Sequence, residues 1–273
     1  MKLFLKILKI GFSSFFLIFI LVVVYFVFLA PKETRFMLAG PQGSLLSQKM
    51  FNQLKGEYPD YSKVYFEQSV AWNKYGNFAK GFELLDQAVE RDPALHLGYR
   101  GWMKLRKLRA YDNALEDFDR LDKLTPDVVD APWGENIDFL RGECYYGKKE
   151  YSKAIEAFNR TIANEKEDWA DPQTFVYLGL CQYQLGNYEK AISEFKRALA
   201  QSASICEAHF GLAQTYLKIG NVELAKTHLK KTEESMVYKR DDEYNEYLNE
   251  IYLWEVLEFK EQLERIPLAD AAL

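Results

Sequence analysis

Three histidines are the residues best suited to acid–base or metal chemistry, and their spacing matches no known site. His96, His209 and His228 form no HExxH pair, and the chain has no GxSxG, Walker A or GxGxxG motif. His209 and His228 fall within helix-like patterns, where ordinary core or surface roles are expected. The carboxylates are spread over polar helix faces, where ion pairs contribute only tenths of a kcal/mol. The sequence therefore predicts no catalysis, no cofactor, no metal site and no small-molecule substrate.

Three cysteines are the remaining candidates for chemistry. Cys144, Cys181 and Cys206 are 37 and 25 residues apart, which matches no CxxC metal or redox motif. Buried small hydrophobic side chains are the favoured interpretation. In an oxidising compartment one pair could still form a disulfide, and the sequence does not decide between these readings.

The composition and net charge of the chain argue against one class of partner. The chain has 273 residues, 48% of them hydrophobic and 15% aromatic, with a net charge of −5. Without the first 30 residues, the remainder carries 32 basic and 40 acidic residues. This acidic balance argues against a nucleic-acid partner, which would need a basic surface.

The N-terminus carries an apolar stretch long enough to cross a bilayer. Ile10 to Ala30 is 21 residues without a charge, and about 1.5 Å per helical residue gives roughly 31 Å. A cleaved signal peptide is the alternative, since lysines precede the stretch, but such a peptide has an apolar core of only about 7–15 residues. Ala30, the candidate cleavage residue, is followed by Pro31 and preceded two positions earlier by Phe28. We therefore expect an uncleaved anchor.

The charges flanking this stretch predict its orientation. Lys2, Lys6 and Lys9 precede it with no acidic residue, whereas Lys32 and Arg35 follow it with Glu33 between them. By the positive-inside rule the N-terminus lies in the cytoplasm and residues 31–273 lie outside it. The expected location is the inner (plasma) membrane, with a single pass and the remaining chain on the extracytoplasmic, periplasmic side.

The elements that follow the anchor repeat. The segment 185–199, "LGNYEKAISEFKRAL", has apolar residues at helix-face spacing after a glycine turn, and four other segments match it. Their small residues recur at intervals of 33, 40, 37 and 34: Gly81, Ala114, Ala154, Ala191 and Ala225. Four positions after each comes a large apolar residue: Leu85, Phe118, Phe158, Phe195 and Leu229. A second helix precedes each turn, so each repeat is a helix pair.

This pattern resembles the tetratricopeptide repeat (TPR) family, whose unit is about 34 residues of helix–turn–helix. The resemblance covers residues 62–239. It implies an all-α fold, a right-handed α-solenoid of about five TPR units with capping helices, preceded by one transmembrane helix. Repeat two departs from the pattern, because Arg109 replaces its turn glycine and its small first-helix residue is Gly101 or Trp102. Insertions at 127–135 and 164–172 flank repeat three.

The remaining segments are expected to connect or cap the array. The predicted order is a basic N-terminal tail (1–9), the anchor (10–30), a linker (31–43), an N-terminal capping helix (44–61), five repeats (62–239), a C-terminal capping helix (240–265) and a tail (266–273). Leu45, Leu46, Phe51 and Leu54 form the expected apolar face of the first cap. The expected stripe of the second is Tyr244, Tyr247, Leu248, Ile251 and Trp254.

The resemblance also implies a concave groove lined by the first helix of each pair. Counting from the aligned small residues places these side chains in it: Phe66, Tyr99, Phe139, Tyr146, Val176, Leu180, Tyr183, Phe210 and Gln214. The carboxylate clamp of some TPR proteins needs Lys and Asn where this chain has Phe66 and Val70, so that specialisation is not expected. The ladder is instead apolar and aromatic. Some of its members could pack between neighbouring helices, and the others would face a peptide.

The function implied is a non-catalytic, membrane-anchored TPR scaffold or adaptor that binds a protein or peptide partner in its groove, outside the cytoplasm. Two alternatives stay open. One is a cytosol-facing import or assembly receptor, and the other is a regulatory subunit of a membrane enzyme complex.

Overall fold

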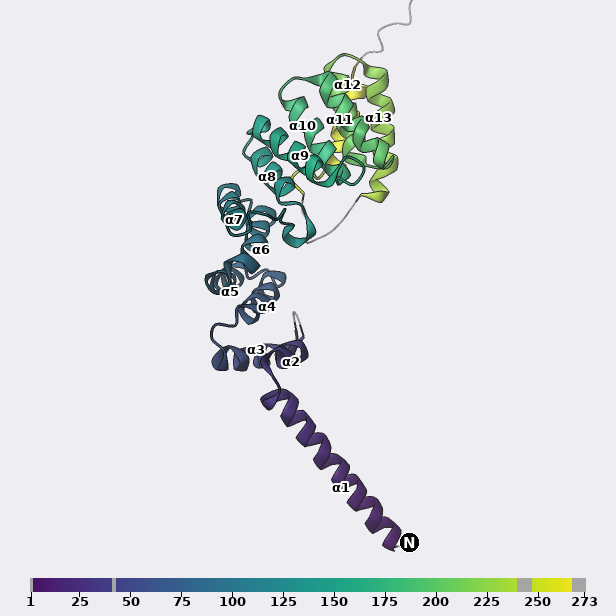
Figure 1. Ribbon diagram of the computed structural model, residues 1–273. Coiled ribbons are helices and arrows are strands. Elements are labelled where there is room, and N and C mark those ends of the chain that lie inside the picture. The colour runs from purple at the N-terminus through teal and green to yellow at the C-terminus, as the bar shows by residue number, and fades with distance from the viewer. Residues whose placement is uncertain (1, 41–42, 240–246, 267–273) are drawn as a thin grey trace, which may run out of the picture. The chain divides into compact units, whose positions relative to one another are not determined.

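The computed structural model describes residues 2–40, 43–239 and 247–266, and every regular element in those ranges is a helix (Figure 1). The chain divides into two compact units, Met1–Arg100 and Gly101–Leu273, with the division inside helix α6 (Pro93–Arg106). Each unit is described by itself. The fold is all-α, as expected.

The first unit begins with a long apolar helix. Helix α1 (Lys2–Val24) continues into a π-helical turn, η1 (Tyr25–Leu29). Within it Lys9–Leu29 is long and apolar enough to cross a membrane, and none of this stretch is buried against the rest of the chain. The expected apolar helix is therefore present, with bounds one residue from the prediction.

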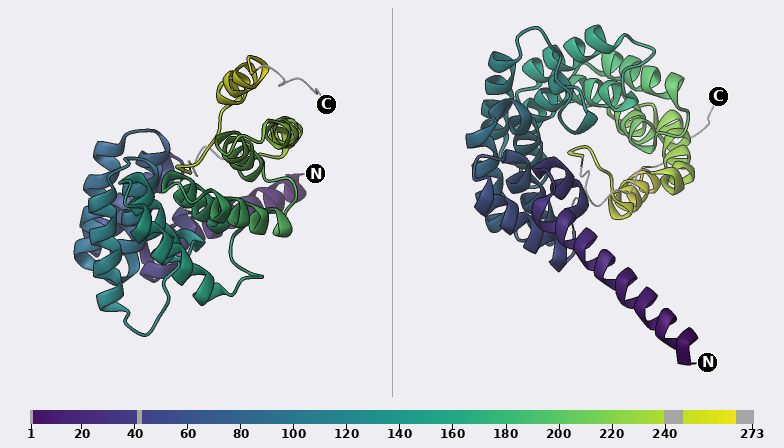
Figure 2. Two further views of the ribbon diagram at one scale, coloured as in Figure 1. Left: turned by 90° about the horizontal axis from the view of Figure 1, so that it is seen from above. Right: turned by 60° about the horizontal axis from the view of Figure 1, so that its bottom comes forward.

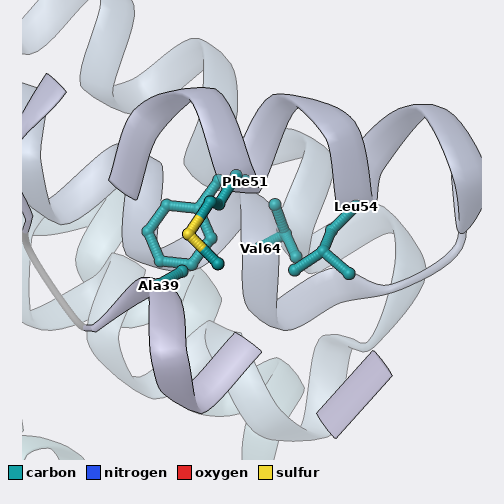
Figure 3. Close-up of a cluster of buried hydrophobic side chains, with 5 residues drawn as sticks. Ala39, Phe51, Leu54 and Val64 are labelled. Carbon is teal, nitrogen blue, oxygen red and sulfur yellow. The ribbon is translucent and has the colours of Figure 1, made fainter. Parts of the chain in front are cut away.

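The expected linker is mostly a helix, which corrects the prediction for residues 31–43. Helix α2 (Lys32–Ala39) packs on α3 (Leu45–Glu57), with Ala39 against Phe51 (Figure 3). The buried Arg35 donates two hydrogen bonds to Glu57, at 2.6 and 2.9 Å. Arg35 and Ala39 lie four residues apart on one helix face, so one ion pair and one apolar contact fix the segment to α3. Residues 41–42 lie outside the described residues.

The apolar face of α3 is only half as predicted. Phe51 and Leu54 are buried, but Leu45 is 85% and Leu46 67% exposed. The buried stripe runs through Ser47, Met50, Phe51 and Leu54. At about 100° per residue, Leu45 and Leu46 lie roughly 160° and 100° away from Ser47. They therefore point away from the first unit's core.

Five helix pairs form the repeats: α4 (Ser62–Lys74) with α5 (Phe78–Arg91), α6 with α7 (Tyr111–Leu124), α8 (Ile137–Gly147) with α9 (Tyr151–Glu165), α10 (Pro172–Gln184) with α11 (Tyr188–Gln201), and α12 (Cys206–Lys218) with α13 (Val222–Ser235). Short 3₁₀ turns η2 (Pro132–Gly134) and η3 (Met236–Tyr238) lie between elements.

Each turn inside a pair contains one residue with a left-handed backbone. These residues are Gly76, Arg109, Lys149, Gly186 and Gly220, with φ between 53° and 81°. Three are glycines, for which this conformation carries no Cβ penalty. Arg109 and Lys149 adopt it at a steric cost, so the turn geometry persists where the sequence lacks glycine.

Repeat two has a longer turn, and this settles its register. A Cβ on Gly101 would lie 2.6 Å from the ring of Phe118, so Gly101, not Trp102, is the small residue of α6. Counting back from Gly101 places Gly98 at the predicted groove position. The placement of Tyr99 there is therefore wrong, and its side chain is buried.

Two pairs of the second unit, α8 with α9 and α10 with α11, pack by inserting a phenylalanine against a glycine. Cβ atoms on Gly142 and Gly179 would stand 2.5 and 2.6 Å from the rings of Phe158 and Phe195. Both rings are completely buried. Only glycine lets the ring lie flat against the neighbouring helix backbone, so the glycine–phenylalanine pairs position the first helices.

The C-terminal capping helix is shorter than predicted. Helix α14 runs only over Leu253–Glu264, and 247–252 are not helical. Residues 240–246, including Tyr244, lie outside the described residues. Val256, Phe259 and Leu263 form the buried stripe of α14. Trp254, expected in the stripe, is mostly exposed.

Candidate functional site

The second unit carries the candidate site on the side of α6, α8, α10 and α12 that the chain's own C-terminal segment covers. We call this surface the inner face. Figure 2 shows the yellow trace that leads into α14, and its side chains and backbone contact residues of α6, α8 and α10. The contacts below place that trace on named side chains.

The predicted groove residues of the second unit divide by burial. Phe139, Val176 and Phe210 are buried, so these three are among the ladder members that pack within the protein. Their neighbours cover them: the Phe139 ring contacts the rings of Phe158, Tyr177 and Tyr247 at 5.7, 5.7 and 6.4 Å. The remaining predicted residues are half-buried: Tyr146, Leu180, Tyr183 and Gln214.

In the first unit the two predicted groove residues contact each other. The rings of Phe66 and Tyr99 are 5.0 Å apart, edge to face, and Phe66 stacks on His96 at 5.1 Å. His96 in turn shares a 3.0 Å hydrogen bond with Ser62. Phe66 and Tyr99 therefore belong to a packed aromatic cluster of the first unit.

A buried ionic cluster lies at the base of the inner face. Arg106 is completely buried, and it donates to Glu143 at 2.7 Å and to Glu135 at 2.6 Å. Trp102 Nε1 donates to the other oxygen of Glu135 at 2.8 Å. Tyr177 Oη donates to Glu143 Oε1 at 2.5 Å. Two carboxylates thus hold one guanidinium in fixed orientation.

Burial raises the pKa values of two groups in this cluster, Glu143 and Tyr177. It raises the pKa of Glu143 to about 7, with Glu135 adding like-charge repulsion and Arg106 opposing the rise. Burial and the neighbouring Glu143 carboxylate also raise the pKa of Tyr177 well above its usual range. Oε2 of Glu143 has no hydrogen-bond partner. Glu143 is therefore poised to take up a proton near neutral pH.

A short non-helical stretch of the chain, residues 247–251, lies on this cluster. The Arg106 guanidinium carbon is 4.2 Å from the centre of the Tyr247 ring. The backbone N–H of Leu248 donates to Tyr177 Oη at 2.9 Å, and Asn249 Nδ2 donates to Gln173 Oε1 at 2.7 Å. We call this stretch the docked segment.

Helix α14 continues the cover beyond the docked segment. Phe259 packs edge to face on Phe210 at 5.5 Å, and Lys260 forms a 2.8 Å ion pair with Glu233 of α13. Beside this contact lies a hollow of about 560 Å³. Its lining includes Phe210, Gln214, Trp254, Glu258 and Gln262. Phe210 and Gln214 thus do border an open recess, as part of a wall shared with α14.

Sequence reasoning missed the ionic cluster and the docked segment. Arg106 and Glu143 both fall on inward positions of successive first helices, so two opposite charges on the predicted groove were an available signal. The docked segment has the spacing of a helix, which gave no sign of these contacts.

The first unit has a separate recess of about 470 Å³ between α3, α4 and α5. Carboxamides line part of it: Gln68 Nε2 donates to Gln48 Oε1 at 3.2 Å and to Asn52 Oδ1 at 2.9 Å. Lys55 Nζ donates to Gln68 Oε1 at 3.2 Å. The apolar part of its rim includes Trp72 and Tyr75. This recess of the first unit is lined mainly by apolar surface, with the carboxamides on part of it.

The cysteines and histidines have structural roles in the described residues. Cys144, Cys181 and Cys206 are free and buried, which confirms the reading as small core side chains. Burial raises the pKa of Cys181 and of Cys206 to about 12. His209 and His228 pair through their Nδ1 atoms at 3.2 Å. No group of three or more potential metal ligands occurs in the ranges that the structure describes.

Comparison with known families matches two of the predicted repeats. A profile described as "TPR repeat" matches residues 179–220, and one described as "Tetratricopeptide repeat" matches residues 138–167. No curated protein sequence matches the chain.

Solved structures share the fold at low sequence identity. PilW, a widely conserved type IV pilus biogenesis factor, is 16% identical with a TM-score of 0.61, over 77% of this chain and 95% of PilW. PilF from Pseudomonas aeruginosa is 11% identical with a TM-score of 0.61, over 85% of this chain and 97% of PilF.

YrrB, a TPR protein with an unusual peptide-binding site, is 17% identical with a TM-score of 0.52, over 68% of this chain and 92% of YrrB. At these identities the likeness shows the fold alone. The two profile matches and the five helix pairs show that the chain contains tetratricopeptide repeats and has the fold of such an array, with an N-terminal apolar helix.

Proposed function

We propose that this chain is a non-catalytic, membrane-anchored scaffold whose inner face binds an extended polypeptide of a partner protein. One observation carries the proposal: the inner face already holds non-helical polypeptide, residues 247–251, through side-chain and backbone contacts. A surface that accepts a backbone N–H and a carboxamide is suited to peptide recognition. The fold class fits this role, because TPR arrays present long surfaces for other chains.

The anchor sets where the scaffold works. Lys9–Leu29 forms an apolar helix with no cover from the chain itself, and a bilayer would provide that cover. The lysines ahead of it favour a cytoplasmic N-terminus, which places the repeats on the extracytoplasmic side. Anchoring would keep the inner face close to the membrane and raise the local concentration of a membrane-bound partner.

The comparisons support an envelope role by analogy of fold. PilW is a type IV pilus biogenesis factor, and YrrB is a TPR protein with an unusual peptide-binding site. A role in assembling or holding an envelope protein is the proposal that fits both the anchor and the inner face.

A site-specific photo-crosslinking experiment in cells tests the partner surface. A photo-crosslinking amino acid at Gln214, which borders the inner-face recess, should give a discrete crosslinked species. The same group at the exposed Thr227 of α13 is the matched control and should give none. Equal crosslinking at both positions, or none at Gln214, would contradict the proposed surface.

A reporter that is active only outside the cytoplasm, fused after Leu273, tests the orientation. Activity supports the extracytoplasmic placement. Silence of this reporter, together with activity of a cytoplasm-specific reporter at the same position, would favour the cytosol-facing alternative.

A further inference from the structure

The docked segment makes contacts that do not depend on its being part of the same chain. It offers an aromatic ring to Arg106, a backbone N–H to Tyr177 and a carboxamide to Gln173. Any extended peptide with an aromatic residue followed two positions later by an asparagine could offer the same three groups. The inner face is therefore a peptide site that is occupied by the chain itself.

The chemistry of the inner face specifies what such a peptide must carry. Glu135 and Glu143 take the hydrogen bonds of the Arg106 guanidinium in its own plane, so the charge is already neutralised. What remains for a ligand is the flat face of the guanidinium, which attracts an aromatic ring. A phosphate or carboxylate of a ligand would meet two like charges there. An aromatic side chain is thus favoured over an acidic one.

The second specificity contact comes from Gln173 at the start of α10. Its Oε1 accepts from Asn249 Nδ2 at 2.7 Å, and Asn249 is buried. A carboxamide in that position has its donor satisfied, whereas an apolar side chain would leave Gln173 unpaired. Tyr177 Oη accepts a hydrogen bond from the backbone, which fixes the register of the peptide between the two side-chain contacts.

Resting on the proposed function, we propose that residues 247–251 are an internal pseudo-ligand, and that the partner is an extended peptide with an aromatic-x-Asn sequence that displaces them. Because the segment is tethered, its effective concentration is on the order of millimolar for a short connection. An external peptide then binds only those molecules whose inner face is free. Its apparent affinity is therefore its intrinsic affinity multiplied by the fraction of such molecules. The intact chain is accordingly a weak binder until the segment is released.

A peptide with the sequence of residues 245–252, labelled with fluorescein, is the probe. Its binding to the full chain in detergent micelles is measured by fluorescence anisotropy. Tyr247→Ala removes the ring on Arg106, so we expect this variant to bind the probe at least tenfold more tightly than the unmodified chain. Tyr238→Ala, which truncates an exposed tyrosine outside the docked segment, is the matched control and should leave the affinity unchanged. A probe with alanine in place of its first tyrosine should not bind.

A second variant guards against an effect on folding. Asn249→Ala removes the contact with Gln173 and should raise probe affinity by about threefold to tenfold, with helix content preserved by circular dichroism. If both variants keep their fold and bind the probe no better than the unmodified chain, the docked segment is a fixed cap and the inference is overturned. Concentration-dependent dimerisation of Tyr247→Ala without gain in probe affinity would also overturn it.

These outcomes are separate from the test of the proposed function. A gain in probe affinity with no crosslink at Gln214 in cells would support the pseudo-ligand and refute the scaffold role. A crosslink at Gln214 with no gain in probe affinity would support the scaffold and refute the pseudo-ligand.

Discussion

Gly179→Ala tests whether glycine–phenylalanine contacts position the first helices of the repeats. The added Cβ would stand 2.6 Å from Cδ1 and Cε1 of Phe195, where carbon atoms prefer about 3.5–4.0 Å. The same part of the ring also lies against Gly211 of the next repeat, where a Cβ would stand 2.3 Å from Cζ and 2.5 Å from Cε1. The methyl group added by Gly179→Ala therefore clashes with a Phe195 ring that is already packed against two helices.

The expected loss in the free energy of unfolding follows from two opposing effects. Overpacking a core that cannot relax costs about 3 kcal/mol, the upper end of the usual range. Replacing glycine by alanine inside a helix returns about 1 kcal/mol through backbone entropy. The net destabilisation is about 2 kcal/mol, which for a unit of this size corresponds to a fall in Tm of about 4–8 °C.

Thermal unfolding of the full chain in detergent, followed by circular dichroism, measures this. Gly56→Ala is the matched control, because a Cβ there meets nothing within 4 Å in helix α3, so it should not destabilise the chain. Adding Phe195→Leu to Gly179→Ala should recover part of the loss, since leucine vacates the ring positions. A Tm for Gly179→Ala at or above that of the unmodified chain, or strictly additive effects in the double variant, would refute the packing argument.

Three further predictions concern the turns and the buried ionisable groups. Lys149→Gly should stabilise the chain by about 0.5–1 kcal/mol, because the exposed Lys149 holds φ at 62°; Gly186→Ala should do the reverse, and both are read from Tm. The pKa of Glu143 is raised to about 7, so its contribution to stability is fully present below its unfolded pKa and is lost as pH rises from about 4.5 through 7; Glu143→Gln should flatten stability over that window in denaturant titrations. His209 Nε2 bonds the Ala203 carbonyl and so donates, which leaves its Nδ1 to accept from His228; the pKa of His228 is lowered to about 4 by burial, then by His209, so the pair's contribution is present above pH about 6.5 and lost as pH falls through 4. His228→Gln should remove this acid sensitivity, and an unchanged pH profile would assign the sensitivity to other groups.

The repeats were predictable because their key contacts are local. Phe158 and Phe195 follow their glycines, Gly142 and Gly179, within the same helix pair, so a fixed spacing in the sequence marks each contact. The left-handed backbone at Arg109 could not be predicted from the residue type. The packing of the helix pair outweighs the preference of this conformation for glycine. The register of repeat two depended on one extra turn residue, which the alignment of second helices could not reveal.

The docked segment was misread as helix for a definite reason. Tyr247, Leu248 and Ile251 have helical spacing, but the helix begins only at Leu253. The Glu255 carboxylate accepts from the backbone N–H of Tyr252 at 2.7 Å, which is the reach-back contact of a helix N-terminus. Upstream of it, contacts with residues more than 70 positions away compete with helix formation, since Leu248 bonds Tyr177 and Asn249 bonds Gln173. Such partners leave no periodic trace in the sequence.

The two features missed by sequence reasoning belong to one hydrogen-bond relay. Tyr177 Oη accepts from Leu248 N–H and donates to Glu143, which accepts from Arg106, and the same guanidinium carries the Tyr247 ring on its face. A buried ion pair of this kind is a weak source of stability, because desolvation offsets much of its attraction. The ion pair instead fixes the orientation of two groups. One is the Tyr177 hydroxyl, which accepts a hydrogen bond from the backbone of the docked segment, and the other is the Arg106 guanidinium, whose face contacts the Tyr247 ring. The docked segment is thus contacted at two adjacent positions, Tyr247 and Leu248, by a single preorganised cluster, and the proposed partner peptide would be contacted in the same way.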